Sequence, residues 1–530
     1  MSFQRSLCFV ARLVPCFALL DAAGYAASTC ESLTTLKLPA TAIVAAVTVE
    51  PGAFAPPTGS PAAFKNLPAF CRVQGVSTPS PDSHIEFEVW LPVSGWNGKY
   101  LGVGNGGFAG SIFYPSLAAV GQGYAVSSTD TGHKGSAIDG EWALGHFEKI
   151  VDFGNRAIHQ TAATSKAIVQ AFYGENPQHS YFNGCSNGGR QALIEAQRYP
   201  ADYDGILAGA PANDITHLFA AFAWNAQALE TDPASYIPLK KMPALESATI
   251  AACDTLDGVK DGVIDDPTRC HFDPSVLACK GADSDACLTD PQIAALKKIY
   301  AGPKNSKGEQ IFPGYQPGGE AGFGGWGAWI TGLAPGKSLQ HAFAQGFFAD
   351  MAFQNASWDF RTLNFDRDLR TADDKMAPIM NAVNPDLKAF KNRGGKLIVY
   401  HGWSDAAISP TNAINYYRSV SATLGERHTG DFVQLYMVPG MQHCGGGPGP
   451  NDFGVNPLAK ADPQHSISTA LERWVESGVA PEKIIATKHK VDTNAASEVI
   501  RTRPLCPYPQ TARYKGSGST DDAGNFTCAK

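Results

Sequence analysis

Short apolar stretches alternate with amphipathic ones along much of the chain, and this alternation is typical of strands and helices in turn. The stretches that predict strands lie at 85–92, 99–107, 124–130, 179–184, 203–212, 395–405 and 432–440. Amphipathic helices are predicted over 155–174 and 466–477. Because the pattern of a strand followed by a helix recurs, we expect an α/β fold with a mostly parallel sheet and helices on both of its faces.

Residues 213–391 interrupt this pattern. The segment contains four cysteines, an acidic cluster at 254–266 and the run 318–332, which is rich in Gly, Trp and Phe. A chain of 530 residues is also longer than one hydrophobic core usually organises. The sequence therefore predicts a core in two parts, 28–212 and 392–530, with 213–391 inserted between them as a lid domain.

The N-terminal segment has the pattern of a secretory signal peptide. Arg5 and Arg12 flank its start, and the apolar run LVPCFALL and the small residues of DAAGYAAS follow. We interpret residues 1–27 as a signal peptide cleaved near Ala26 or Ala27; an N-terminal membrane anchor is the alternative. No later apolar run is long enough to span a bilayer, so we expect the mature chain to be secreted or periplasmic, without stable membrane association.

The overall composition is that of a globular protein. Hydrophobic residues make up 44% of the chain, charged residues 17%, and the formal net charge is −7. Proteins that bind the phosphates of nucleic acids normally present a basic surface. The composition therefore argues against nucleic acid as a partner.

The cysteine content supports export. Two of the twelve cysteines lie in the expected signal peptide, and the remaining ten are an even number, which favours disulfides in an exported chain. A zinc site is the alternative, but the sequence has no CxxC pair. Closeness in sequence suggests three bridges: Cys253–Cys270, Cys279–Cys287 and Cys506–Cys528. Four cysteines remain: Cys30, Cys71, Cys185 and Cys444.

A G-x-S-x-G motif stands between a predicted strand and a predicted helix. It comprises Gly184, Cys185, Ser186, Asn187 and Gly188. In this context the serine lies at the tip of a tight turn, where its hydroxyl can act as a nucleophile, and the glycines avoid collisions within the turn. The alternative is a glycine-rich turn whose serine only caps the helix.

Partners for Ser186 follow in the order that a parallel-sheet hydrolase requires. Asp405 comes just after the predicted strand in LIVYHGWSDAAIS, and His443 just after the next one in LYMVPGMQHCGGG. A serine hydroxyl needs an imidazole to take its proton and a carboxylate to orient that imidazole. We predict a triad of the three residues; a helix-capping carboxylate and a surface histidine are the alternatives.

Such a nucleophile also needs an oxyanion hole. One donor is expected to be the backbone N–H of Asn187, the residue after the nucleophile, and the second to lie in the glycine-rich segment 102–110. A phosphate-binding loop is the competing interpretation of 102–110. The GxGxxG spacing does not fit in register there and no Lys-Ser/Thr follows, which argues against a nucleotide site.

The predicted triad also suggests the remaining disulfides. Cys185 precedes Ser186 and Cys444 follows His443, so a triad brings these two cysteines near one another, as a disulfide requires. If Cys185 pairs with Cys444, only Cys30 and Cys71 remain: Cys30–Cys71 and Cys185–Cys444.

These residues resemble the CS-D-HC arrangement of the tannase and feruloyl esterase family. The resemblance extends over nearly the whole mature chain, through GWNGKYLGVGNGG, GCSNGGRQAL, PADYDGILAGAPA, YHGWSDAAISP and RPLCPYPQTARYKGSG. It implies a secreted serine esterase with an α/β-hydrolase core, a large lid and a disulfide between the cysteines that flank the triad. It also assigns roles: Ser186 as nucleophile, His443 as base, Asp405 as its orienting acid, and the N–H groups of Gly107 and Asn187 as oxyanion donors.

The acidic cluster resembles the calcium loop of the same family. Asp254, Asp257 and Asp261 can turn their carboxylates onto one hard cation. The family pattern adds the backbone carbonyls of Val259 and Val263. The resemblance therefore implies a structural calcium ion in the lid, and no organic cofactor; a solvated acidic turn is the alternative.

The acyl groups handled by the family are flat aromatic acids: hydroxycinnamates such as ferulate, gallate, and mono(2-hydroxyethyl) terephthalate. We therefore expect aromatic side chains of the lid to contact the substrate. Ordinary packing within the lid is the alternative for each of them. The candidates are Trp326, Trp329, Phe343, Phe347 and Phe348, of which Trp329, Phe343 and Phe347 are preferred.

The terephthalate enzymes of the family carry a lid arginine for the second carboxylate. LAPGKSLQHAFAQGFFADMAF contains none, although Lys337 is nearby. We therefore expect feruloyl esters as the preferred substrates, free or attached to plant polysaccharide or polyphenol, with gallate esters or mono(2-hydroxyethyl) terephthalate as alternatives. A serine exopeptidase on the same fold is the alternative from a different class of enzyme.

Overall fold

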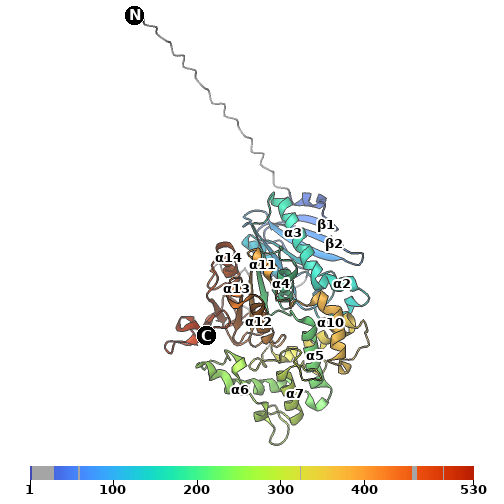
Figure 1. Cartoon of the computed structure of the whole chain (residues 1–530), viewed down its shortest axis with the longest axis vertical. Helices are drawn as coiled ribbons and strands as arrows, with labels where there is room; N and C mark the ends of the chain where they lie inside the picture. The colour runs from blue at the N-terminus through green and yellow to red at the C-terminus, as the bar shows by residue number, and fades with distance from the viewer. Residues whose placement is uncertain (3–28, 58–59, 323, 456–461, 493) are drawn as a thin grey trace.

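A nine-stranded sheet lies at the centre of the computed structural model, which describes residues 1–2, 29–57, 60–322, 324–455, 462–492 and 494–530 (Figure 1). In sheet order the strands are β1 (Thr41–Val49), β2 (Phe70–Ser77), β3 (Ile85–Pro92), β5 (Ala125–Thr129), β4 (Lys99–Val103), β6 (His179–Cys185), β7 (Gly205–Gly209), β8 (Lys396–Gly402) and β9 (Val433–Val438). The expected signal peptide, 1–27, falls almost entirely outside the described residues.

The sheet is mostly parallel. β1, β2, β3 and β5 pair antiparallel with one another in that order. All five pairings from β5 through β4, β6, β7 and β8 to β9 are parallel. A strand has formed in each of the seven stretches for which the hydrophobic pattern predicts one.

Helices cover both faces of the sheet, as expected. The long ones are α3 (Ala157–Tyr173), α4 (Asn187–Arg198), α12 (Thr411–Leu424) and α14 (Ile467–Ser477), and the short ones are α1 (Tyr114–Leu117), α2 (Phe147–Val151) and α13 (Glu426–Gly430). Phe182 and Leu397 pack in the hydrophobic cluster that includes residues of α3, α4 and α12. Their neighbours Tyr181 and Ile398 pack in the cluster that includes residues of α14. This alternation is what a strand buried on both faces requires.

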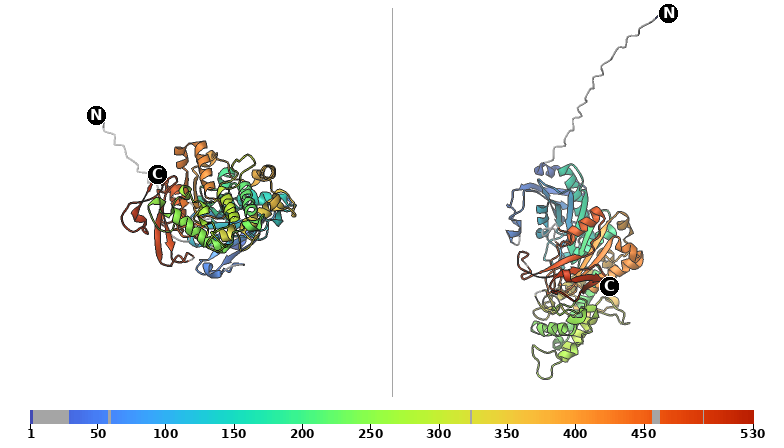
Figure 2. Two further views of the ribbon diagram at one scale, coloured as in Figure 1. Left: turned by 90° about the horizontal axis from the view of Figure 1, so that it is seen from below. Right: turned by 90° about the vertical axis from the view of Figure 1, so that its left-hand side faces the viewer.

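Between β7 and β8 the chain leaves the sheet and forms a helical lid. Its helices are α5 (Ile215–Glu230), α6 (Met242–Cys253), α7 (Asp290–Ala301), α8 (Trp326–Trp329), α9 (Leu339–Gln345), α10 (Arg367–Met380) and α11 (Lys388–Asn392). In Figures 1 and 2 the green helices α6 and α7 lie at the end of the molecule opposite β1 and β2. Phe219 of α5 and Phe343 of α9 share a hydrophobic cluster with Phe153 and Phe108, so apolar packing holds the lid to the rest of the chain.

The C-terminal part adds two small antiparallel sheets that the hydrophobic pattern does not predict. They comprise β10 (Ile484–His489) with β11 (Val499–Leu505), and β12 (Thr511–Tyr514) with β13 (Phe526–Ala529). Arg503 of β11 forms an ion pair with Asp261 of the lid. The C-terminal sheets therefore contact the acidic loop directly.

Five disulfides join distant and neighbouring parts of the chain. They are Cys30–Cys71, Cys185–Cys444, Cys253–Cys270, Cys279–Cys287 and Cys506–Cys528, the same five pairings that the sequence suggests. Within the described ranges, none of the helices combines the length and the hydropathy needed to cross a bilayer.

Candidate active site

Ser186 occupies a strained turn between β6 and α4. Its φ of 65° and ψ of −122° lie where a residue with a Cβ atom is rarely found. The turn is held by hydrogen bonds: the N–H of Ser186 donates to the carbonyl of Gly209 at 3.0 Å, and its own carbonyl accepts from the N–H of Ala212 at 3.1 Å. A Cβ atom on Gly184 would lie 2.5 Å from the carbonyl oxygen of Gly188, which explains the first glycine of the motif.

Asp405 and His443 form a buried hydrogen-bonded pair. Asp405 follows β8, and its Oδ2 accepts a hydrogen bond from Nδ1 of His443 at 2.8 Å. Oδ1 accepts the backbone N–H groups of Ala407 and Ile408 at 2.8 and 2.9 Å. With the proton on Nδ1, Nε2 of His443 is left with a lone pair, which is the tautomer that a general base needs.

The pKa of the Asp405 carboxyl group reflects these contacts. Burial alone would raise it, but the charge of His443 and hydrogen bonds from His401 and His443 outweigh burial, so the pKa lies well below its usual value. Asp405 is therefore ionised at neutral pH, as a carboxylate that orients an imidazole must be.

The Cys185–Cys444 disulfide links the turn of Ser186 to the loop of His443. The Cα atoms of the two cysteines are 6.0 Å apart although 259 positions separate them in sequence. Because Ser186 follows Cys185 and His443 precedes Cys444, the bridge restricts how far these two loops can move apart.

The two predicted oxyanion donors lie beside Ser186. Gly107, Ser186 and Asn187 line the same cavity. Among the described residues, no acceptor takes a hydrogen bond from the backbone N–H of Gly107 or of Asn187, so both are free to bind a ligand. Gly107 has a φ of 53°, and a Cβ atom there would lie 2.2 Å from the carbonyl oxygen of Ala137, so no other residue fits this position.

Buried polar contacts fix the loop that carries Gly107. The N–H of Asn105 donates to Oε1 of Gln191 at 3.1 Å, and Nε2 of His133 contacts the carbonyl of Phe108 at 2.8 Å. Burial lowers the pKa of His133 to about 4, so this ring is neutral at physiological pH and its contact with the carbonyl requires Nε2–H.

The cavity at Ser186 is almost entirely apolar. Its volume is about 50 Å³, and beyond Gly107, Ser186 and Asn187 it is lined by Ala212, Ile215, Leu218, Phe219, Phe222, Trp329, Phe343, Ala407 and Ile408. The ring of Trp329 also meets the imidazole of His443 edge-on, with centroids 5.0 Å apart. Two of the three preferred lid aromatics, Trp329 and Phe343, therefore contribute to the site.

The structure places Phe347 behind the cavity lining. It is fully buried, and its ring lies 4.8 Å from that of Phe219 and 5.0 Å from that of Phe348. Phe343 and Phe347 would share a face of an ordinary α-helix. Residues Gly346–Ala352 instead form a π-helix, whose wider turn changes the direction of the side chains that follow α9.

Four lining residues belong to α5, which the prediction of lid contacts overlooks. Ile215, Leu218, Phe219 and Phe222 are spaced i, i+3, i+4 and i+7, so they form one stripe of the helix. That spacing is visible in the sequence directly after the Gly209 strand end, and it is the signal that identifies them.

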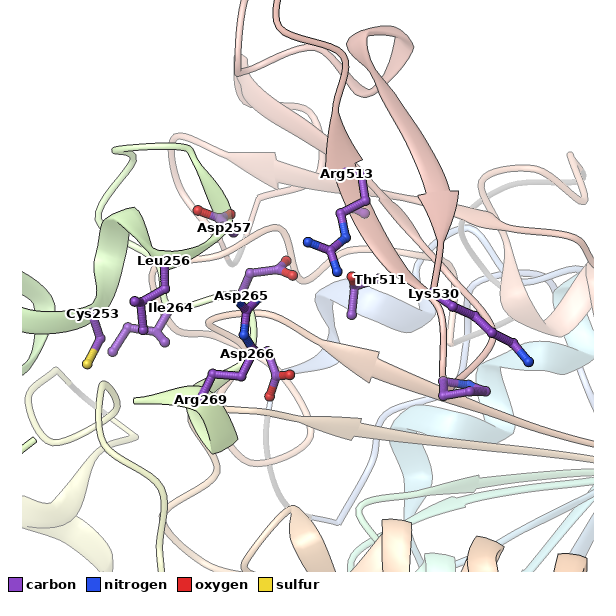
Figure 3. A pocket seen from close by; sticks show the side chains of 12 residues that line it. Cys253, Leu256, Asp257, Ile264, Asp265, Asp266, Arg269, Thr511, Arg513 and Lys530 are labelled. Atoms are coloured by element: carbon purple, nitrogen blue, oxygen red, sulfur yellow. The ribbon is translucent and has the colours of Figure 1, made fainter. Parts of the chain in front are cut away.

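The acidic loop after α6 lies against the C-terminal sheets. Asp257 and Asp265 line a cavity of about 160 Å³ that Thr511 and Arg513 of β12 also line (Figure 3). Burial, and secondly the charge of Asp257, raises the pKa of Asp265 to about 7. Arg501 and Arg503 also lie at this loop, because both form ion pairs with Asp261. The nitrogen–oxygen distance is 3.3 Å for Arg501 and shorter for Arg503.

The residue types of this loop are those that a hard cation prefers. Its four carboxylates (Asp254, Asp257, Asp261 and Asp265) lie beside Arg501 and Arg503, but in the described part of the chain no three of them bring oxygens within 4.8 Å of one another. No described donor reaches the carbonyl oxygens of Val259 and Val263, both in buried residues. The surplus of carboxylates over arginines, and the two carbonyl oxygens without a described donor, suit Ca²⁺.

A second group has ligand-like spacing elsewhere in the lid. In the described part of the chain, Cys279, Asp283 and Cys287 are the one group of three or more potential ligand atoms that lie within 4.8 Å of one another. Cys279 and Cys287 are joined by a disulfide, so their sulfurs are not thiolates and do not bind metal.

Comparisons with known proteins identify the family of the chain. The family model for tannase and feruloyl esterase matches residues 71–529. An uncharacterized esterase of Xanthomonas campestris pv. campestris is 45% identical over 96% of this chain and 92% of its own length. The mono(2-hydroxyethyl) terephthalate hydrolase of Piscinibacter sakaiensis is 33% identical over 92% of this chain and 89% of its own.

A solved structure extends the comparison to three dimensions. Feruloyl esterase B from Aspergillus oryzae superposes with a TM-score of 0.86 at 30% identity, covering 94% of this chain and 99% of that one. The chain therefore has the α/β-hydrolase fold and is a carboxylic ester hydrolase. It belongs to the tannase and feruloyl esterase family.

Proposed function

We propose that the protein is a serine esterase that hydrolyses esters of aromatic acids through an acyl-enzyme on Ser186. One observation carries the proposal: His443 is held by Asp405 at 2.8 Å, and the Cys185–Cys444 bridge ties it to the turn of Ser186. The serine lies in a cavity that also holds two unpaired N–H groups.

Acylation uses each of these groups. Oγ of Ser186 attacks the ester carbonyl while Nε2 of His443 takes the hydroxyl proton. The negative charge that develops on the carbonyl oxygen is stabilised by the N–H groups of Gly107 and Asn187. When the ester C–O bond breaks, His443 gives the proton to the departing alcohol, and the acyl group stays on Ser186.

Deacylation repeats the chemistry with water. His443 takes a proton from a water molecule as that molecule attacks the acyl carbonyl, and the same N–H groups stabilise the second oxyanion. His443 then returns the proton to Oγ of Ser186 as the free acid leaves. Asp405 remains ionised throughout and keeps the imidazole in one orientation.

The cavity lining supports an aromatic acyl group without a second charge. Phe219, Phe222, Trp329 and Phe343 offer flat apolar contacts, which suit a planar ring. No lining side chain is charged, and apart from Ser186, Asn187 and the indole N–H of Trp329 none carries a hydrogen-bonding group. We therefore favour feruloyl and related hydroxycinnamoyl esters, with gallate esters and mono(2-hydroxyethyl) terephthalate as alternative substrates.

A panel of esters tests this preference. We expect kcat/KM for methyl ferulate to exceed that for mono(2-hydroxyethyl) terephthalate by about tenfold or more, because the free carboxylate of the terephthalate would lose water without gaining a partner. Bis(2-hydroxyethyl) terephthalate is the matched control, since it has the same ring and no charge. Comparable values for ferulate and the charged monoester would contradict the assignment, and a much higher value for methyl gallate would favour tannase activity.

We also propose a structural calcium ion in the lid, held by Asp254, Asp257, Asp261 and the carbonyl oxygens of Val259 and Val263. When bound, the ion would neutralise the excess carboxylate charge of the loop. The loop contacts Arg501 and Arg503 of β11, so the ion would stabilise the junction between the lid and the C-terminal sheets.

Chelation tests the calcium proposal. EGTA is expected to lower Tm by about 5 °C, and added Ca²⁺ to restore it, because an ion that binds only the folded chain stabilises it by mass action. Asp257→Ala should abolish this response. Asp285→Ala, which removes an exposed lid carboxylate paired with Lys240, should keep it. A Tm that changes with neither EGTA nor Ca²⁺ would contradict the calcium proposal.

Export is the third part of the proposal. Sets of five disulfides are typical of oxidising compartments and rare in the cytosol, and the N-terminal pattern is that of a secretory signal. We propose that the mature enzyme works in the periplasm or outside the cell on small aromatic esters, including those attached to plant polysaccharide or polyphenol.

A further inference from the structure

A second imidazole contacts the carboxylate of Asp405. His401 lies in β8 and its side chain is fully buried. Its Nε2 is 3.0 Å from Oδ2 of Asp405 and 3.1 Å from the carbonyl oxygen of Ile408. Oδ2 is the same oxygen that accepts Nδ1 of His443. Two histidines, one from strand β8 and one from the loop after β9, therefore meet at one carboxylate oxygen.

The surroundings fix the proton on this second ring. Both groups near Nε2 of His401 are oxygen acceptors, so Nε2 must carry a hydrogen and donate it. Nδ1 is buried and has no hydrogen-bond partner among the described residues. A proton there would be a buried donor without an acceptor, which is costly. His401 is therefore a neutral ring that donates from Nε2.

Asp405 consequently receives four N–H donors, two on each oxygen. Oδ1 takes the backbone groups of Ala407 and Ile408, and Oδ2 takes the rings of His443 and His401. Three of these donors stay in place during the reaction. The fourth, on His443, belongs to the ring whose charge changes at every proton transfer.

We propose that His401 is a positioning residue for catalysis: it holds the Asp405 carboxylate ionised and aimed at His443, so that the proton taken from Ser186 stays on His443. The inference rests on the serine mechanism proposed above. A donor that does not change charge spreads the negative charge of Oδ2 over two hydrogen bonds. Asp405 is then a weak proton acceptor that orients His443 without competing for its proton.

The geometry also explains why the donor comes from β8. His401 is held by the sheet, where its residue pairs with Met437 of β9, whereas His443 lies in a loop after β9. A ring fixed in a buried strand can fix the carboxylate on the neighbouring loop. The carboxylate in turn gives His443 a single direction in which to donate.

Among the residues that the structure describes, few other titratable groups face this pair. Those in contact with Asp405 are the two histidines, and Tyr315 of the lid reaches the same loop by donating from its hydroxyl to the carbonyl of Ala407 at 2.8 Å. Burial, and secondly the charge of Asp405, raises the pKa of Tyr315 far above its usual value, so this hydroxyl stays neutral. A change of pH profile on altering His401 therefore reports on Asp405 and His443.

Two amide substitutions separate positioning from packing. In His401→Gln the amide nitrogen can reach the place of Nε2 and donate to Asp405, whereas the shorter side chain of His401→Asn leaves its amide near Nδ1. We expect His401→Asn to lower kcat by about 10- to 100-fold, the worth of a hydrogen bond to a charged group, with KM changed less than about threefold. His401→Gln should recover most of the wild-type kcat.

The pH profile and the proton spectrum provide the readouts that a structural role would not move. Loss of the donor concentrates charge on Asp405 and favours protonated His443, so the acid limb of kcat/KM should move to higher pH in His401→Asn and not in His401→Gln. The downfield ¹H resonance of the His443 Nδ1–H should shift in the same variant. Rates are normalised to the active fraction by titration with a p-nitrophenyl phosphonate, which counts folded sites.

The control is His489→Asn, because His489 is another buried histidine whose Nε2 contacts a carboxylate, that of Asp452, at 3.0 Å. It should leave kcat and the acid limb unchanged. If His401→Asn and His401→Gln behave alike, or if His401→Asn keeps wild-type kcat and acid limb, the inference is wrong. Ser186→Ala in the same series separates failure of this inference from failure of the proposed function, because full activity of Ser186→Ala would refute the serine mechanism itself.

Discussion

Replacing Ser186 by alanine is expected to lower kcat by about 10⁶-fold, the order observed when the nucleophile of a catalytic triad is removed. Without the hydroxyl, no acyl-enzyme forms, and a water molecule would have to attack an ester whose cavity is shaped around the serine. The remaining N–H groups of Gly107 and Asn187 can still polarise the carbonyl, so a small rate above that in water persists. KM should change little.

The variant should fold normally, which makes the result interpretable. Alanine and serine both have one Cβ atom, so alanine adds no strain to the turn with a φ of 65°. The hydrogen bonds that hold the turn use backbone groups, from Ser186 to Gly209 and from Ala212 to Ser186. They survive the substitution.

Two measurements check this prediction. Initial rates on p-nitrophenyl esters give kcat, and a p-nitrophenyl phosphonate should phosphonylate wild-type Ser186 and release one equivalent of p-nitrophenol, but none from Ser186→Ala. Ser357→Ala is the control, because Ser357 is exposed in a lid turn and hydrogen-bonds only to Asn355; it should keep full activity. Activity of Ser186→Ala above about 1% of wild type would show that another group is the nucleophile.

The sequence pattern predicts the central sheet well and its margins poorly. Strands such as β7 and β8 are buried on nearly every residue, so they appear as continuous apolar runs. β1 is at the edge of the sheet and only one of its residues is buried. β11 begins with exposed residues and is buried only at its end. β11 gives neither a continuous apolar run nor a clean alternation. β1 does contain an apolar run, at 42–47, although most of it is not buried, and the prediction overlooks it.

The residues of the site also divide into those that the sequence predicts and those that it does not. Ser186, Asp405 and His443 could be predicted because each follows a strand end in the order of the fold. The cavity lining depends on how the lid packs, and no local pattern shows that Phe347 is turned toward Phe219 by a π-helix. His401 escapes prediction for a different reason: its role depends on the proton positions around Asp405, which only a three-dimensional arrangement reveals.

Replacing Asp405 by asparagine is expected to lower kcat by about 10⁴-fold, although the side chain keeps its shape. The carbonyl oxygen of the asparagine must occupy the place of Oδ1, because the N–H groups of Ala407 and Ile408 donate there at 2.8 and 2.9 Å. Its amide nitrogen then takes the place of Oδ2. A hydrogen-bond acceptor has become a donor at the point where His443 needs an acceptor.

The expected fall in kcat comes from the loss of the His443 tautomer that can act as a base. Facing an amide N–H, Nδ1 of His443 must present its lone pair, so the neutral ring carries its proton on Nε2 and cannot accept the proton of Ser186. His401 meets the same donor with its own Nε2–H and has to abandon the contact. The 2.8 Å contact with His443 thus reverses its direction and the 3.0 Å contact with His401 is lost, and the negative charge that would neutralise the imidazolium is lost as well.

Steady-state rates across pH, together with Tm, check this prediction. The matched control is Asp452→Asn, which alters the carboxylate of the His489 pair away from the cavity; it should cost stability at most and leave kcat within about threefold. Phosphonate labelling of Ser186 should also be slower in Asp405→Asn by a similar factor, because activation of Oγ needs the same tautomer. If hydrolysis fell while labelling kept its wild-type rate, Asp405 would act at the deacylation step alone, and the orienting role assigned to it here would be wrong.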